Sequence, residues 1–206
     1  MAIHSAVPGL LAGAMLSFWI TVISAVADAP PRHVRGTIQS VEGHTITVQT
    51  TRGRTDTITL TDDAKVFTVA PADISGIKDG KFVGITSVER NGRRTAIEVH
   101  VFDESLRGRG EGHRPWDLGS EPSTMTNGNI ARVESVGNDR VLTLAYKDGS
   151  QTIAVSPDAT IVAFTTGTPD QIKPGAKVFV LAHGVPEGRL GAEAIVVGKD
   201  GLQPPM

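Results

Sequence analysis

Gly36-Thr37-Ile38 and Gly128-Asn129-Ile130 open two segments of this chain that carry the same landmarks in the same order. The first copy continues through Thr57-Ile58-Thr59-Leu60, Asp63-Ala64, Lys78-Asp79-Gly80, Gly92-Arg93 and Ala96. The second continues through Thr152-Ile153-Ala154-Val155, Asp158-Ala159, Lys173-Pro174-Gly175, Gly188-Arg189 and Ala192. The offset between matching landmarks grows only from 92 positions (36 to 128) to 96 positions (92 to 188), as small insertions in surface turns would produce. The chain therefore contains two copies of one small domain.

Within each copy, apolar and polar residues alternate with a period of two. Residues 34–41, 45–49 and 56–61 show this alternation, and Asn91-Gly92 is a strong hairpin signal. A period of two is typical of strands with one buried and one solvated face. The pattern predicts an all-β protein.

One short helical signal follows the third predicted strand of each copy, within residues 71–80 and 168–175. Thr168 is suited to cap a helix whose first residue is Pro169. Two more strands follow in each copy: 81–90 with 94–102, and 176–184 with 190–198. We therefore predict two tandem five-stranded OB-like barrels, residues 34–102 and 127–198, each with one short helix after the third strand.

The order of these landmarks (Gly-x-Ile, Thr-rich strands, Asp-Ala, a Lys-x-Gly turn, Gly-Arg, Ala) resembles a group of bacterial exported β-barrel repeats of unknown function. The resemblance covers about residues 34–102 and 127–198 and implies a fold rather than an activity. The chain also bears a more distant resemblance to periplasmic copper chaperones built on the same small barrel. That second resemblance implies a Cu(I) site of methionine and histidine beneath a tryptophan ring.

The N-terminal 27 residues are predicted to be a secretory signal peptide. They contain no Asp, Glu, Lys or Arg, and they end in the small-x-small sequence Ala25-Val26-Ala27 before Asp28. We expect cleavage after Ala27 and a periplasmic or secreted protein without a membrane segment. The alternative is that the apolar run is kept as a membrane anchor.

Composition limits the partners of the exported chain. It has 20 basic and 22 acidic residues and no cysteine. A nucleic-acid surface would normally show a basic excess, so we expect no nucleic-acid partner. The absence of cysteine excludes disulfides and thiolate chemistry. A protein or an envelope polymer remains as partner, and the sequence leaves the oligomeric state open.

The sequence gives little support for catalysis. Gly108-x-Gly110-x-Gly112 resembles a phosphate-binding loop, but no helix follows to hold the phosphate. Carboxylates such as Asp62 and Asp63 fall in predicted turns, where aspartate accepts backbone hydrogen bonds. We predict that the protein is not an enzyme. The five phenylalanines after the predicted signal peptide and Tyr146 sit mostly among apolar neighbours and are expected to pack in the core.

Residues 103–126 have an unusual composition, rich in glycine and charge, and are predicted to form a structured linker between the barrels. Trp116 is the only tryptophan after the predicted signal peptide. An indole buries a large apolar area and needs a partner for its N–H. We interpret Trp116, with its neighbours Arg114 and Asp117, as an interaction site that docks against one or both barrels.

A metal site is the competing interpretation of this segment. His113, Trp116 and Met125 are candidate ligands for copper, and Asp103, Glu104, Glu111, His113 and Asp117 are candidates for a divalent ion. No histidine is duplicated between the copies, because His100 aligns with Val196 and His183 with Val88. Most histidines are therefore expected to be exposed.

The sequence as a whole predicts a non-catalytic exported binding or interaction module, with no cofactor. The groove between the barrels and residues 103–126 form its expected working surface. The alternative is a periplasmic metal-binding protein that uses the same segment.

Overall fold

The computed structural model describes residues 31–185 and 189–206, and the predicted signal peptide lies outside these residues. The described chain is all-β, with twelve strands and only three-residue 3-10 helices. The strands are β1 (Arg32–Glu42), β2 (Thr45–Thr50), β3 (Thr55–Pro71), β4 (Phe82–Arg90), β5 (Arg93–Phe102), β6 (Gly112–Trp116), β7 (Ser123–Val136), β8 (Asp139–Tyr146), β9 (Gly149–Val155), β10 (Thr160–Thr166), β11 (Lys177–Val185) and β12 (Arg189–Gly198). None of the helices in the described residues has the length and hydrophobicity needed to cross a bilayer.

Five strands close into a barrel that we call lobe 1. The hydrogen-bonded order is β1-β2-β3-β12-β11, and β11 pairs again with β1. Alternate residues of these strands face inward, and side chains such as Ile46, Ile58 and Ile195 are fully buried in its core. Closure leaves no unpaired edge in this part of the sheet.

Five other strands form lobe 2, in the order β4-β5-β9-β8-β7, with β7 pairing back onto β4. Strands β5 and β9 meet at one bridge, between Thr95 and Ala154. Ile85, Leu142 and Ile153 are fully buried in the core of this lobe. Strand β6 pairs with the edge of β7 that lies opposite the edge paired with β4.

The strands pair across the two copies, which differs from the predicted arrangement. Residues 34–102 were expected to close on themselves, but β4 and β5 join lobe 2, while β11 and β12 join lobe 1. Corresponding positions make corresponding pairs: Gly36 faces Val178, and Gly128 faces Val83. Because the copies share one strand pattern, the last two strands of either copy fit the first three of the other.

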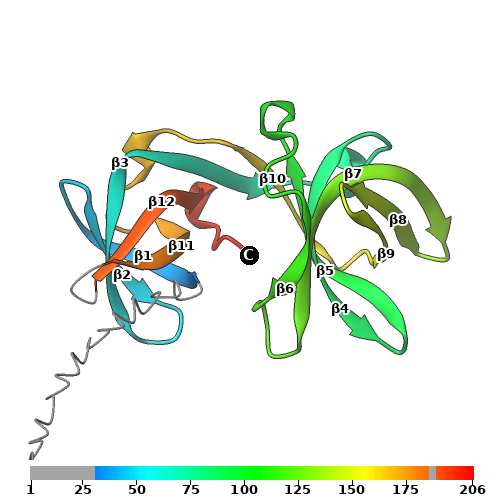
Figure 1. The fold of residues 1–206 in the computed structure, drawn as a ribbon, viewed down its shortest axis with the longest axis horizontal. Coiled ribbons are helices and arrows are strands. Elements are labelled where there is room, and N and C mark those ends of the chain that lie inside the picture. The colour runs from blue at the N-terminus through cyan, green and yellow to red at the C-terminus, as the bar shows by residue number, and fades with distance from the viewer. Residues whose placement is uncertain (1–30, 186–188) are drawn as a thin grey trace, which may run out of the picture.

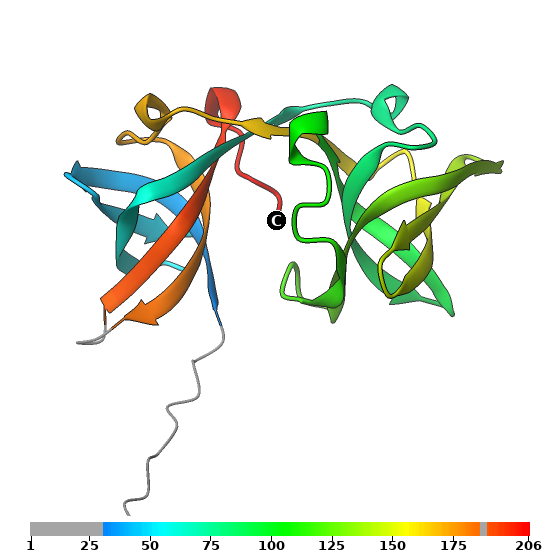
Figure 2. The same ribbon diagram turned by 45° about the horizontal axis from the view of Figure 1, so that its top comes forward.

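The two lobes are joined by the end of β3 and by β10, which run antiparallel with Val69 opposite Phe164. Figures 1 and 2 show these strands crossing from one lobe to the other. Within residues 71–80 and 168–175, where short helices were predicted, the chain forms only the three-residue 3-10 turns η1 (Ile74–Gly76) and η3 (Pro169–Gln171).

Residues 103–126, predicted as a linker, contain η2 (Glu104–Leu106), β6 and the first residues of β7. Gly108, Gly110 and Gly112 all have positive φ angles (82°, 59° and 131°), and they turn the chain back so that β6 runs against β7. The strand was not predicted because five residues that include Pro115 give no clear alternation.

A third apolar cluster lies between the lobes. It contains five of the six phenylalanines, Phe67, Phe82, Phe102, Phe164 and Phe179, together with aliphatic residues and Met206. The phenylalanines are buried, as the sequence predicts, but between the lobes rather than inside them. The last residues of the chain run into the same space after η5 (Lys199–Gly201), as Figures 1 and 2 show.

Candidate functional site

The outer faces of the two lobes meet at an apolar cleft of about 180 Å³, which we call the interlobe cleft. Lobe 1, β3 and the C-terminal tail contribute an apolar side: Phe67, Phe179, Leu181, Ala194, Val196 and Met206. Lobe 2, β10 and the 103–126 segment contribute aromatic, polar and basic groups: His100, Phe102, Arg109, Gly110, Arg114, Trp116, Met125, Asn127 and Phe164. The cleft therefore has chemically different walls, although the strands that build them are copies of each other.

The two walls differ at positions that correspond to each other in the two predicted copies. Glu98 and His100 on β5 correspond to Ala194 and Val196 on β12 under the 96-residue offset of this region. All four are on the outer face of their lobe, and only the β5 wall is polar. The polar side chains that could recognise a ligand therefore lie on the lobe 2 side of the cleft.

Glu98 and His100 are almost completely buried, with 1% and 3% of their surface exposed. His100 Nε2 and Glu98 Oε1 are in direct contact, although neither atom has a hydrogen bond of normal geometry. Thr86 Oγ1 donates to Glu98 Oε2 at 3.3 Å and lies 3.9 Å from Met125 Sδ. These residues form a polar layer under the cleft. The expectation that most histidines are exposed is wrong: among the described residues only His44 is exposed, whereas His33, His113 and His183 are half-buried and His100 is buried.

Trp116 is the contact between the 103–126 segment and lobe 1. Its ring centroid lies 4.2 Å from that of His33 on β1 and 6.1 Å from that of Phe179 on β11. These contacts agree with the interpretation that Trp116 docks against a barrel. The indole Nε1 is buried and has no hydrogen-bond partner in the part of the chain that the structure describes.

Asp117 fixes the same segment to β1 through charge. Arg35 Nη2 donates to its carboxylate at 2.7 Å, and His33 Nδ1 is in contact with the same oxygen. Partial burial alone would raise the pKa of Asp117, but the hydrogen bonds from Arg35 and His33 outweigh it and lower the pKa to about 2. Arg35 Nε also donates to the main-chain oxygen of Met206, so one guanidinium holds both the segment and the tail.

Two further arginines border the cleft. The Arg109 guanidinium carbon lies 4.1 Å from the centroid of Phe67, and that of Arg114 lies 5.5 Å from the centroid of Trp116. Arg114 Nη1 donates to the carbonyl of Gly110 at 2.8 Å. Partial burial lowers the pKa of both arginines. Neither has a carboxylate within ion-pair distance among residues 31–185 and 189–206.

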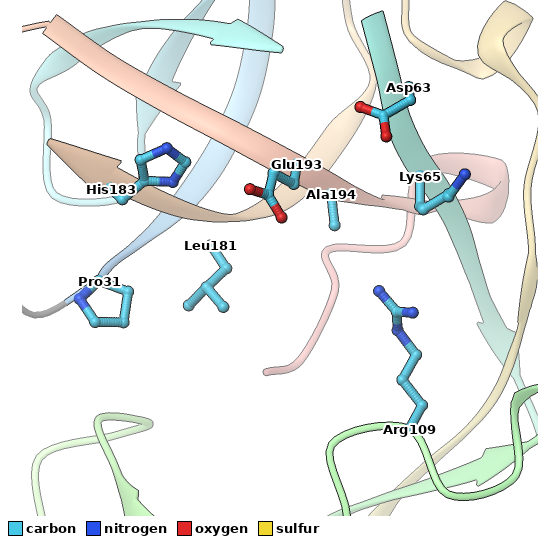
Figure 3. Close-up of a pocket in the computed structure, with 8 residues that line it drawn as sticks. All are labelled: Pro31, Asp63, Lys65, Arg109, Leu181, His183, Glu193 and Ala194. Carbon is cyan, nitrogen blue, oxygen red and sulfur yellow. The ribbon is translucent and has the colours of Figure 1, made fainter. Parts of the chain in front are cut away.

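A wider and more polar pocket adjoins the cleft and shares Arg109, Leu181 and Ala194 with it. Figure 3 shows Arg109 reaching from the segment before β6 towards β12 and β3, where Glu193 and Lys65 lie. This outer pocket has a volume of about 460 Å³. Arg109 therefore lies at the boundary between the apolar interlobe cleft and the more polar outer pocket.

The structure does not bring the predicted metal ligands together. Arg114, Trp116 and Met125 line the interlobe cleft, but His113 lies on the opposite face of β6. There its Nδ1 is 2.8 Å from Thr126 Oγ1, and its ring stacks on Tyr146. Residues 31–185 and 189–206 contain no group of three or more His, Asp or Glu side chains placed to hold a metal ion.

Sequence reasoning identified Trp116, Arg114 and Asp117 but did not identify their partners. Glu98 and His100 could have been noticed, because two ionisable residues occupy one face of a strand whose alternate residue, Val99, is apolar. Arg109 carries no such signal. Comparison of the chain with protein-family models, curated proteins and solved structures gave no match.

Proposed function

We propose that this protein is an exported, non-catalytic binding module whose ligand site is the interlobe cleft. In this proposal both lobes are OB-like barrels of the exported repeat type, and lobe 2 is the less tightly closed of the two. The periplasmic or secreted location rests on the charge-free segment and the Ala25-Val26-Ala27 sequence at the N-terminus.

The observation that carries the proposal is an aromatic cleft with unpartnered polar atoms. Ligand sites are commonly concave and apolar, with a few convergent polar groups. In the interlobe cleft, Trp116 Nε1 and Asn127 Oδ1 are buried without a hydrogen-bond partner among the described residues. A buried polar atom without a partner is unfavourable by about 1–3 kcal/mol, and a bound ligand could satisfy it.

Binding rather than catalysis is proposed because the ionisable pair of the cleft is engaged with itself. Glu98 and His100 contact each other, and the second carboxylate oxygen accepts from Thr86. The remaining wall is mostly aromatic and aliphatic. Such a surface suits the recognition of a small apolar body.

A second candidate function is soft-metal binding, because His100, Trp116, Met125 and Met206 all line the same cleft. Thioether and imidazole groups are suitable ligands for Cu(I). This set differs from the predicted one, since His100 takes the place of His113.

One titration tests both candidates. A Trp19→Phe background leaves Trp116 as the only tryptophan, and its emission is followed while benzyl alcohol or Ag(I) is added. Binding in the cleft predicts a saturable change with benzyl alcohol that Ala194→Phe abolishes, because the new ring fills the cleft. The matched control Ala131→Phe adds the same ring at an exposed position of β7 and should leave the change intact.

The other outcomes are equally decisive. A response to Ag(I) that saturates near one equivalent and disappears in Met125→Leu would favour metal binding over the apolar ligand. No response to either probe would mean that the cleft only packs the lobes together, and the binding proposal would be wrong.

A further inference from the structure

We infer that the interlobe cleft binds a small carboxylate with one aromatic ring, the ring lying among the phenylalanines and the carboxylate at Arg109 and Arg114. This inference rests on the proposed function and adds the chemical class of the ligand to it.

The first argument is charge. Arg109 and Arg114 present guanidinium groups at the cleft, and no described carboxylate pairs with either. Arg35 and Arg107 differ, since they pair with Asp117 and Glu104. Stacking on Phe67 and Trp116 holds the guanidinium groups of Arg109 and Arg114 in place without neutralising them. A bound anion would supply the negative charge that neither Arg109 nor Arg114 finds within the described chain.

The second argument is the balance of donors and acceptors. The guanidinium groups can only donate hydrogen bonds, and so can the buried Trp116 Nε1, which has no acceptor within the described chain. Asn127 Oδ1, which is also unpartnered, is an acceptor that a carboxylate does not engage. An ionised carboxylate only accepts, through two oxygens with about four acceptor positions. It can engage a guanidinium group with two parallel bonds, which gives geometric selectivity as well as affinity.

The third argument is size and shape. A volume of about 180 Å³ is close to that of the engineered apolar cavities of about 150 Å³ that hold one benzene ring. The ring centroids of Phe67 and Phe102 lie 5.3 and 4.9 Å from that of Phe164, so a ligand ring would enter an aromatic surface that is already assembled. Larger apolar bodies would have to displace Met206, which is 3% exposed.

The position of Glu98 orients the ligand. Its two carboxylate oxygens contact His100 Nε2 and Thr86 Oγ1 under the β5 side of the cleft, and β5 contributes no guanidinium group to the lining. Arg109 faces the outer pocket of about 460 Å³, which is lined by Lys65 and also by the carboxylates of Asp63 and Glu193 (Figure 3). Neither carboxylate is within ion-pair distance of Arg109. The charged group therefore belongs at Arg109, and the ring points inward.

The experiment compares benzoate, benzyl alcohol and acetate by Trp116 fluorescence in the Trp19→Phe protein. Benzoate and benzyl alcohol have the same ring, and acetate has only the charge. We expect benzoate to bind about tenfold or more tightly than benzyl alcohol, and acetate not to bind measurably. Arg109→Gln should lower the ratio of benzoate affinity to benzyl alcohol affinity about tenfold, because only benzoate carries the charge that Arg109 would bind.

The control Arg132→Gln removes the same charge from an exposed ion pair on β7 and should change neither affinity. Circular dichroism and urea unfolding of each variant verify that the fold is retained. Equal binding of benzoate and benzyl alcohol would overturn this inference while leaving the proposed binding function intact. Tighter binding of phenyl phosphate than of benzoate would overturn the carboxylate assignment. Failure of all ring compounds would contradict the proposed function itself.

Discussion

Gly36 and Gly128 open the two copies because another strand passes too close for a side chain. A Cβ atom at Gly36 would lie 2.1 Å from the carbonyl oxygen of Gln49, and one at Gly128 would lie 2.7 Å from that of Ala145. Real Cβ atoms do not come closer than about 3 Å to such backbone atoms. The shared glycine is therefore a requirement of the first strand pair in each lobe.

Gly36→Ala should lower the free energy of unfolding by about 1–3 kcal/mol, because the backbone of β1 or β2 must move to accommodate the methyl group. Gly128→Ala should have a smaller effect, since its contact is longer. Urea unfolding measures both. Gly184→Ala is the matched control on β11, where a Cβ would meet nothing within 4 Å. If all three variants have the same stability, the steric explanation is wrong.

At the scale of elements, β6 is an added strand that fastens one lobe to the other. It pairs with β7 of lobe 2, and the two residues at and after its end, Trp116 and Asp117, contact β1 of lobe 1. An apolar ring contact and a charged contact thus lie side by side. Because of the charged contact, the free energy of unfolding should depend on pH.

Asp117→Asn should destabilise the protein at neutral pH but not at strongly acidic pH. The folded pKa of Asp117, about 2, is below the ordinary value of 3.8, so its contribution is complete above pH 4 and is lost as the pH falls towards 2. Because the side chain is 46% exposed, solvent screening limits that contribution to about 1 kcal/mol. Urea unfolding at pH 7, 4, 3 and 2 should show the difference in free energy of unfolding between wild type and variant shrinking from pH 4 to pH 2.

The control is Asp148→Asn, at an exposed turn position without an ion pair among the described residues. Its stability relative to wild type should not follow the same course with pH. A stability difference for Asp117→Asn that stays constant from pH 4 to pH 2 would contradict the proposed charge contact.

At the scale of the whole molecule, the all-β strand pattern could be predicted because it is a local property of the sequence. The alternation at residues 45–49 and 56–61 shows which side chains face inward wherever the strand is placed. The choice of partner strand is not local. Because β4–β5 and β11–β12 have the same pattern, the sequence cannot distinguish pairing within a copy from pairing between copies.

The same ambiguity in strand pairing explains why most residues of the interlobe cleft could not be predicted from the sequence. The cleft is formed by outward-facing residues of strands from different lobes, such as His100 from β5 and Phe179 from β11. Outward-facing residues look solvated when each strand is considered alone. Trp116 could be singled out because a large apolar ring among glycines and charges is conspicuous without knowledge of the fold.

The exchange can be tested directly because the chain has no cysteine. Thr37 and Lys177 are register partners in β1 and β11, so Thr37→Cys with Lys177→Cys should form a disulfide on mild oxidation. Asn129 is the second-copy counterpart of Thr37, and pairing within that copy would place it opposite Lys177. In the exchanged fold Asn129 faces Phe82 instead, so Asn129→Cys with Lys177→Cys should remain reduced. Both variants share one cysteine, so mass spectrometry and non-reducing gel mobility compare them directly. A disulfide in the second variant and not in the first would show that each copy closes on itself, and the interlobe cleft would then lose the strands that build it.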